Sequence, residues 1–235
     1  MNFIKVNNYE ELSIKAASII AAEVIRKPSC VLGLATGSSP VGTYKNLIKW
    51  CKDGILDFSA VTTINLDEYV GLDGTSDQSY RYFMNDNLFD HININKANTF
   101  VPNGKANDLN AECQAYDERI KKMGIDIQLL GIGVDGHIGF NEPDSVFTKE
   151  THAVTLDKST IEANSRFFQS IDDVPKTAVT MGMGGIMSAK KILLVANGKN
   201  KKDILEKAFK GAIDPKVPAS VLQLHPDVTV IFAEN

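Results

Sequence analysis

The stretch LLGIGVDGHIGFNEP, residues 129–143, places three ionisable side chains, Asp135, His137 and Glu142, on a glycine-rich backbone. Imidazole titrates near neutral pH, which suits proton transfer, and neighbouring carboxylates can orient it and stabilise its charged form. A lone loop histidine is usually a surface residue, but three ionisable groups within eight residues favour an acid–base site. A metal site would need more histidine or cysteine ligands at defined spacing, so we predict none here.

The same stretch also has the spacing of a dinucleotide-binding loop. Gly131, Gly133 and Gly136 spell G-x-G-x-x-G directly after an apolar segment. A dinucleotide loop should then open a helix. The residues that follow are HIGFNEP, in which Gly139 and Pro143 both oppose a helix. The sequence therefore argues against a nicotinamide cofactor.

A second loop, after Leu34, reads ATGSSPVGTYKNL. Gly37 allows a sharp turn, Ser38 and Ser39 add hydroxyl groups, and Pro40 suits the first turn of a helix. Peptide N–H groups at such a helix start bind anions, which favours phosphate. The structural alternative is an ordinary helix capped by Ser39. No GK[ST] follows, so nucleotide hydrolysis is not expected.

A third loop follows Leu66 and begins with the neighbouring acids Asp67 and Glu68. If the strand continued, the two side chains would point to opposite faces, which argues against a shared cation. A cap or turn role is the structural alternative for Asp67. Its position at the carboxyl end of a predicted strand favours a functional role.

Short apolar segments alternate with longer amphipathic ones along the chain. The apolar segments, predicted to be strands, are residues 3–6, 30–34, 61–66, 125–130, 178–181, 191–196 and 228–232. The predicted helices are residues 9–26, with Asn8 as a possible N-cap, and 40–52, 79–89, 108–123 and 200–210.

This alternation predicts one α/β domain of three layers (α/β/α) with a mainly parallel, Rossmann-like sheet. Residues 143–177 fit it least well, and we predict an insertion or lid there. In parallel sheets, ligands bind beyond the carboxyl ends of the strands, where the three loops begin.

The composition excludes several classes of protein. The 235 residues carry a net charge of −4 with both signs interspersed, so neither nucleic acid nor a membrane surface is an expected partner. The N-terminus does not resemble a signal peptide, and AASIIAAEVI is too short to span a bilayer. We expect a cytoplasmic location, with Cys30, Cys51 and Cys113 as buried or incidental thiols.

Six segments, in this order, resemble the glucosamine/galactosamine-6-phosphate isomerase family. They are GLATGSSP (33–40), NLDEYVGL (65–72), SYRYFM (79–84), GIGVDGHIGFNEP (131–143), ANSRFF (163–168) and LQLHPD (222–227). The resemblance implies the reaction of the family's deaminases, which convert glucosamine 6-phosphate and water to fructose 6-phosphate and ammonia in amino-sugar catabolism. It implies no redox cofactor.

The resemblance also implies roles for individual residues. Asp67 would move a proton from C2 to C1, and His137 would open the sugar ring, with its protonation set by Asp135 and Glu142. The phosphate-binding residues would be Gly37, Ser38, Ser39, Arg166 and Lys201.

Two departures from the family pattern qualify these expectations. The phosphate loop has Ala35 and a Ser-Ser pair where relatives often have Pro and Gly-Thr. The sequence also lacks the C-terminal helical extension of longer members, which are hexamers activated by N-acetylglucosamine 6-phosphate. We therefore expect no such activation, and a monomer or a small homo-oligomer.

Two alternative functions are compatible with parts of this pattern. A 6-phosphogluconolactonase shares the DGH segment but typically continues with TASLFP, so Glu142 and the YVGL segment favour a deaminase. A non-catalytic sugar-phosphate sensing domain would need a DNA-binding module, and no helix-turn-helix or basic face is predicted.

Overall fold

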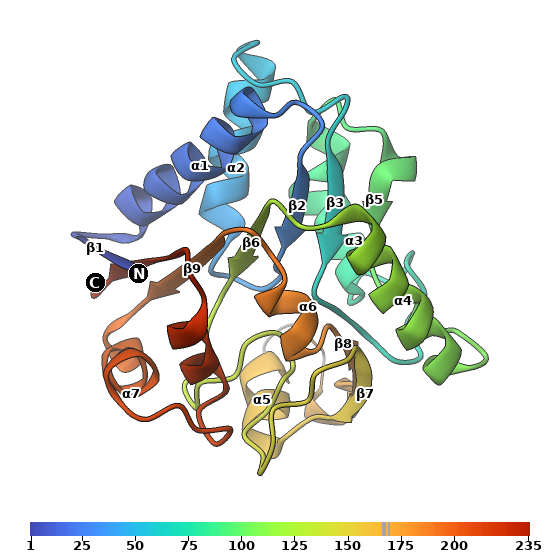
Figure 1. Cartoon of the computed structure of the whole chain (residues 1–235). Coiled ribbons are helices and arrows are strands. Elements are labelled where there is room, and N and C mark those ends of the chain that lie inside the picture. The colour runs from blue at the N-terminus through green and yellow to red at the C-terminus, as the bar shows by residue number, and fades with distance from the viewer. Residues whose placement is uncertain (166–167, 169) are drawn as a thin grey trace.

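The computed structural model describes residues 1–165, 168 and 170–235 and has a parallel sheet at its centre (Figure 1). Its strand order is β1-β10-β9-β6-β2-β3-β5, and neighbouring strands are parallel throughout. The strands are β1 (Asn2–Val6), β2 (Val31–Leu34), β3 (Thr62–Asn65), β5 (Thr99–Phe100), β6 (Ile127–Leu130), β9 (Ile192–Asn197) and β10 (Val228–Ala233).

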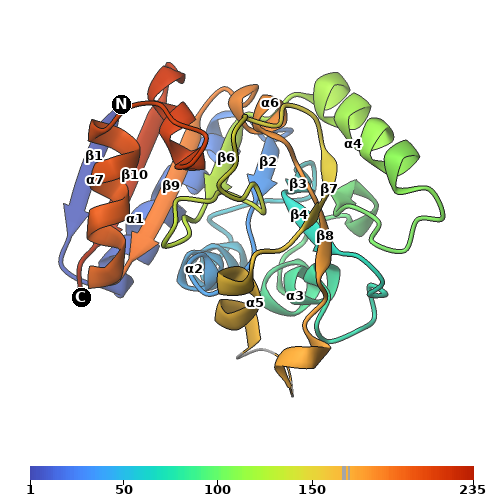
Figure 2. The same ribbon diagram turned by 90° about the horizontal axis from the view of Figure 1, so that it is seen from below.

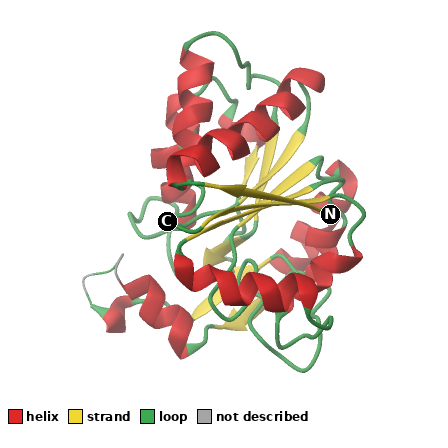
Figure 3. Cartoon of the chain, turned by 90° about the vertical axis from the view of Figure 1, so that its left-hand side faces the viewer, coloured by secondary structure: helices red, strands yellow, loops and turns green. Residues whose placement is uncertain are grey.

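Helices cover both faces of this sheet, as Figure 3 shows. One buried core joins the sheet to α1 (Tyr9–Arg26), α2 (Val41–Lys52) and α3 (Tyr80–Asn87). A second core, on the opposite face, joins it to four other helical elements. These are α4 (Leu109–Met123), α6 (Met183–Met187), α7 (Lys202–Lys210) and the 3-10 segment η6 (Pro218–Leu224). The predicted three-layer α/β/α fold is confirmed.

Local sequence explains the main elements. The inner strands β2 and β6 are buried along their whole length, as expected of near-continuous apolar runs covered on both faces. Helix α1 has the predicted bounds, and the Asn8 side chain accepts a hydrogen bond from the Glu11 N–H at 2.9 Å. Both Cys30 and Cys113 are buried, Cys51 is partly buried, and none forms a disulfide.

A second, smaller sheet was not foreseen. It is antiparallel, with the order β4-β8-β7, and consists of β4 (Asp67–Tyr69), β7 (His152–Thr155) and β8 (Thr177–Thr180). The apolar segment 178–181 is therefore a strand, but it does not join the parallel sheet. It pairs instead with β4, which places Asp67 opposite Thr180 and inside a strand rather than in a loop.

Residues 143–177, the predicted insertion, contain β7 and helix α5 (Lys158–Asn164). In Figure 2, β7 and β8 lie beside β4, and α5 is drawn between α2 and α3. Within the described part of the chain, no helix is long and apolar enough to cross a membrane.

Four predicted helices begin one or two residues later than expected. Helices α3 and α4 begin at Tyr80 and Leu109, because Ser79 and Asp108 are their N-caps. Helix α2 begins at Val41, and its N-cap is Pro40, which supplies no side-chain hydrogen bond; Ser39 is not the cap. Helix α7 begins at Lys202 after the 3-10 turn η5 (Lys199–Lys201).

Candidate active site

A cavity of about 800 Å³ opens at the carboxyl ends of the parallel strands. The loops after β2 and β6, the start of β4 and the turn after β9 all contribute to its lining. It brings together most of the predicted site residues, namely Gly37, Ser38, Ser39, Asp67, Asp135, His137 and Lys201. Glu142 lies next to His137, while Arg166 falls outside the described residues.

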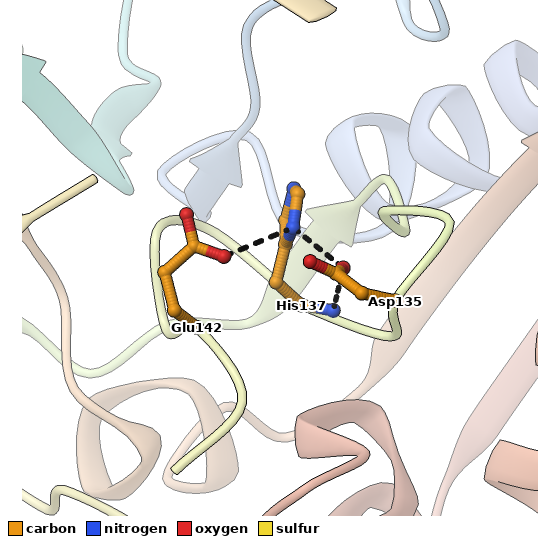
Figure 4. Close-up of side chains that lie close together, drawn as sticks. All are labelled: Asp135, His137 and Glu142. Atoms are coloured by element: carbon orange, nitrogen blue, oxygen red, sulfur yellow. Dashed lines mark hydrogen bonds and ion pairs between the residues drawn. The ribbon is translucent and has the colours of Figure 1, made fainter. Parts of the chain in front are cut away.

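The imidazole of His137 lies between two carboxylates (Figure 4). Its Nδ1 is 2.8 Å from Oδ1 of Asp135 and 3.4 Å from Oε2 of Glu142. The Asp135 carboxylate also accepts the His137 backbone N–H at 3.1 Å. Only glycine fits at position 133, because a Cβ there would lie 2.3 Å from the imidazole. Glycine at position 133 thus lets the loop pass close to the histidine.

Electrostatics make His137 a cation in the resting site. Burial opposes its charged form, but the hydrogen bonds and charges of Asp135 and Glu142 outweigh burial and raise its pKa to about 9. The hydrogen bond to His137 likewise overcomes the burial of Asp135 and holds its pKa below the usual range. At neutral pH the imidazole therefore carries a proton that it can donate.

The carboxylate of Asp67 is suited to act as a base, whereas His137 is suited to act as an acid. It is only 5% exposed, and burial, assisted by the charge of Glu68, raises its pKa to about 8 although the His137 charge opposes this. A carboxylate that binds its proton this tightly is a much stronger base than an exposed one once it is ionised. The site thus combines an acid and a base.

Comparison with known proteins places this site in a family. The sequence matches the family described as glucosamine-6-phosphate isomerases/6-phosphogluconolactonase over residues 7–231. A glucosamine-6-phosphate deaminase of Lachnoclostridium phytofermentans is 62% identical over 232 residues, 98% of each chain. The chain belongs to this family. A Clostridium perfringens deaminase is 58% identical over 236 residues, 100% of this chain and 98% of that one.

Solved structures agree with the assignment to the isomerase/lactonase family. A structure described as a monomeric glucosamine-6-phosphate deaminase matches with a TM-score of 0.97 and 49% identity, covering 99% of this chain and 97% of that one. A 6-phosphogluconolactonase from Thermotoga maritima matches with a TM-score of 0.76 and 18% identity, covering 100% and 99%. At that identity the lactonase shows the shared family fold alone.

Three further side chains belong to the site, and we predicted no individual role for them from the sequence. Glu68 accepts the backbone N–H groups of Tyr69, Tyr80 and Arg81 at 2.8–2.9 Å, which fixes the N-terminus of α3 beside β4. Tyr80 lines the cavity and stacks on Phe140, with ring centroids 5.9 Å apart. The SYRYFM segment of the family pattern was the signal for Tyr80.

Thr160 is the third such residue, and no motif pointed to it. It is buried in α5, within the predicted insertion, and lines the cavity. Its hydroxyl donates a hydrogen bond of 2.6 Å to Oε1 of Glu142. The insertion therefore contacts the acid–base group directly.

A metal ion is geometrically conceivable in this family member, because ligand atoms of Asp135, His137 and Glu142 lie within 4.8 Å of one another. However, both carboxylates approach the same imidazole nitrogen, at 2.8 and 3.4 Å, as ion-pair partners. A protonated imidazole held between two carboxylates explains the arrangement better than a shared metal ion, because a protonated nitrogen has no lone pair to offer a metal.

Lys201 is the N-cap residue of α7 and lines the same cavity. Its Nζ donates a hydrogen bond of 2.8 Å to the carbonyl oxygen of Ile132. The turn of Gly37, Ser38 and Ser39, which leads into α2, also lines this cavity. An ammonium group and the start of a helix, both suited to binding an anion, thus share one cavity.

Proposed function

We propose that this chain converts glucosamine 6-phosphate and water to fructose 6-phosphate and ammonia, a step of amino-sugar catabolism. The observation that carries the proposal is full-length identity of 62% and 58% to two glucosamine-6-phosphate deaminases, in a chain whose cavity combines a cationic histidine with a buried carboxylate. The chain is an enzyme acting on a small sugar phosphate.

Ring opening is the first step that we assign. The imidazolium of His137 donates its proton to the ring oxygen, and the neutral imidazole then takes the proton of the C1 hydroxyl. The protein's net protonation is unchanged, and the C1 aldehyde is free to react. In this scheme Asp135 and Glu142 keep His137 charged and oriented.

Isomerisation and deamination follow from the aldehyde. Ionised Asp67 removes the C2 proton while the His137 imidazolium protonates the C1 oxygen, which gives an enolamine. Asp67 then returns its proton to C1, which leaves an iminium at C2. Water adds to the iminium carbon and ammonia leaves, the proton released in this step restores the imidazolium, and the C2 ketone of fructose 6-phosphate results. Burial of Asp67 supplies the basicity that C2 deprotonation requires.

The phosphate group is remote from C1 and C2, so its binding energy can position them for reaction. We assign phosphate binding to the turn formed by Gly37, Ser38 and Ser39, together with Lys201. Arg166 is assigned to the same group by the family pattern alone. Residues 143–177 are proposed to act as a lid that carries Arg166 to the phosphate.

We also propose a monomer or a small homo-oligomer that N-acetylglucosamine 6-phosphate does not activate. The likeness to a structure described as monomeric, at 49% identity over 99% of this chain, supports this. Light scattering after size exclusion, and an assay with and without N-acetylglucosamine 6-phosphate, test the two statements separately.

The decisive experiment measures ammonia release from glucosamine 6-phosphate by the purified chain. We expect release from the wild-type protein and none from the folded Asp67→Asn variant. Hydrolysis of 6-phosphogluconolactone is measured in parallel. A folded wild-type protein that opens the lactone but releases no ammonia would overturn the proposal.

A further inference from the structure

The side chain of Tyr9 reaches the proposed phosphate turn from a different helix. Its hydroxyl lies 2.9 Å from the carbonyl oxygen of Ser38 and 3.1 Å from that of Ser39. It also accepts the backbone N–H of Gly42 at 2.8 Å. One hydroxyl, at the start of α1, thus contacts both the turn before α2 and the first residues of α2 itself.

These contacts replace a missing helix cap. Helix α2 begins after Pro40, which has no side chain able to accept a hydrogen bond. A capping side chain normally accepts the N–H of the second or third helical residue. Gly42 is the second residue of α2, and its N–H is satisfied by Tyr9 instead. The tyrosine therefore holds the first turn of the helix from outside.

The contacts with the carbonyl groups also set the direction of the peptide planes. In a trans peptide, the C=O and the following N–H point in opposite directions. When the Ser38 carbonyl turns towards Tyr9, the N–H of Ser39 therefore turns away from the tyrosine. The Tyr44 hydroxyl donates to the Ala35 carbonyl oxygen at 2.5 Å and orients the Ala35–Thr36 peptide in the same manner.

Packing keeps Tyr9 in this position. The Ser13 hydroxyl donates to the Tyr9 carbonyl at 2.7 Å, one turn along α1. A Cβ at Gly42 would lie 2.1 Å from the Ser13 hydroxyl and 3.1 Å from the Tyr9 ring. Glycine at position 42 therefore lets α1 and α2 approach closely enough for the tyrosine to reach the turn.

We infer that Tyr9 is a positioning residue for substrate binding, which orients the peptide groups of the turn at residues 37–39 towards the substrate phosphate. This inference rests on the proposed function, because it takes that turn as the phosphate site. It assigns no part in proton transfer to Tyr9. Its loss should therefore weaken phosphate binding without slowing the chemical steps.

The test compares Tyr9→Phe with the wild-type protein and with Tyr82→Phe, an exposed tyrosine of α3 that does not line the cavity. Losing one hydrogen-bonding group should raise KM for glucosamine 6-phosphate roughly 3- to 10-fold, with kcat nearly unchanged. The inhibition constant of inorganic phosphate should rise by the same factor, and Tyr82→Phe should change neither.

Gly42→Ala gives a second approach, because the added methyl group pushes against Ser13 and the Tyr9 ring and so displaces the Tyr9 hydroxyl from the turn without removing it. This substitution should raise both KM for glucosamine 6-phosphate and the inhibition constant of inorganic phosphate. Unchanged constants in a folded Tyr9→Phe protein, or a loss of kcat with KM unaffected, would overturn the inference. A wild-type protein that releases no ammonia would instead overturn the proposed function, and the inference with it.

Discussion

Oδ1 of Asp135 lies 2.8 Å from Nδ1 of His137 and forms an ion pair with this imidazole, whose pKa is raised to about 9. The histidine is therefore protonated at neutral pH and can act as an acid. The base of the site, Asp67, has a pKa of about 8. The proposed reaction needs the first group protonated and the second ionised. Activity should thus be highest between these two values, on the alkaline side of neutrality.

Replacing Asp135 by Asn tests the first of these two titrations. The amide keeps an acceptor oxygen for His137 but removes the negative charge, so the histidine pKa should fall by roughly one unit. The alkaline limb of kcat/KM should move to lower pH by the same amount. Histidine NMR titration measures the pKa directly. An alkaline limb that stays in place would show that it reports another group.

The same pKa shift affects stability with a definite sign. The folded-state pKa of His137, about 9, lies above its ordinary value of 6.5. Its charge therefore stabilises the fold fully below pH 6.5, and the contribution is lost as pH rises through about 9. In Asp135→Asn this pH dependence should be weaker, which urea unfolding at pH 6 and pH 10 can measure.

The Asp67→Asn variant should be inactive yet more stable than the wild-type protein at neutral and alkaline pH. Asp67 has a raised pKa, so its favourable contribution is complete below its ordinary pKa of 3.8 and is lost as pH rises towards about 8. Because asparagine carries no charge, the variant does not lose this stability as the pH rises. Between pH 5 and pH 8 the variant should gain about 2–4 kcal/mol of unfolding free energy relative to wild type.

Two measurements check this prediction. Exchange of the C2 proton with deuterated solvent should disappear while substrate still binds. Urea unfolding should show the pH-dependent gain. Undiminished exchange would remove Asp67 from the role of base, and an equal stability difference at both pH values would contradict its raised pKa.

Glu68→Gln should lower the pKa of the base, Asp67, without abolishing activity. Burial is the main cause of the raised pKa of Asp67, and the Glu68 charge adds to it. Without that charge, the acidic limb of kcat/KM should move to lower pH by roughly one unit. The amide also presents N–H groups to the donors at the start of α3, so stability should fall. If the acidic limb of kcat/KM kept its position in a folded variant, the Glu68 charge would not contribute to the raised pKa of Asp67.

The sequence predicted the layers and most of the site, for identifiable reasons. Strands such as β2 and β6 are buried runs of apolar residues, and α1 starts at a residue that caps it. Ligand sites in parallel sheets lie at the carboxyl ends of the strands, so the three loops were expected together. In the structure Asp67, Asp135 and His137 line one cavity.

What the sequence did not reveal depends on contacts between distant segments. The strand β8 looked like any other apolar strand, and only its pairing with β4 separates it from the parallel sheet. The partners of Glu68 are backbone N–H groups, which nearly every residue type has, so the sequence does not identify them. The pKa values of Asp67 and His137 likewise depend on burial and on charges brought together by folding.

The hydrogen bond from Thr160 to Glu142 connects the proposed lid to the acid–base group. Thr160→Val keeps the shape of the side chain and removes the donor to Oε1 of Glu142. Since Glu142 would then be held less firmly against His137, kcat should fall roughly 3- to 10-fold. Thr155→Val, at an exposed position of β7 in the same segment, is the matched control. Equal activity of both variants in an assay of ammonia release would show that Glu142 is oriented without help from the insertion.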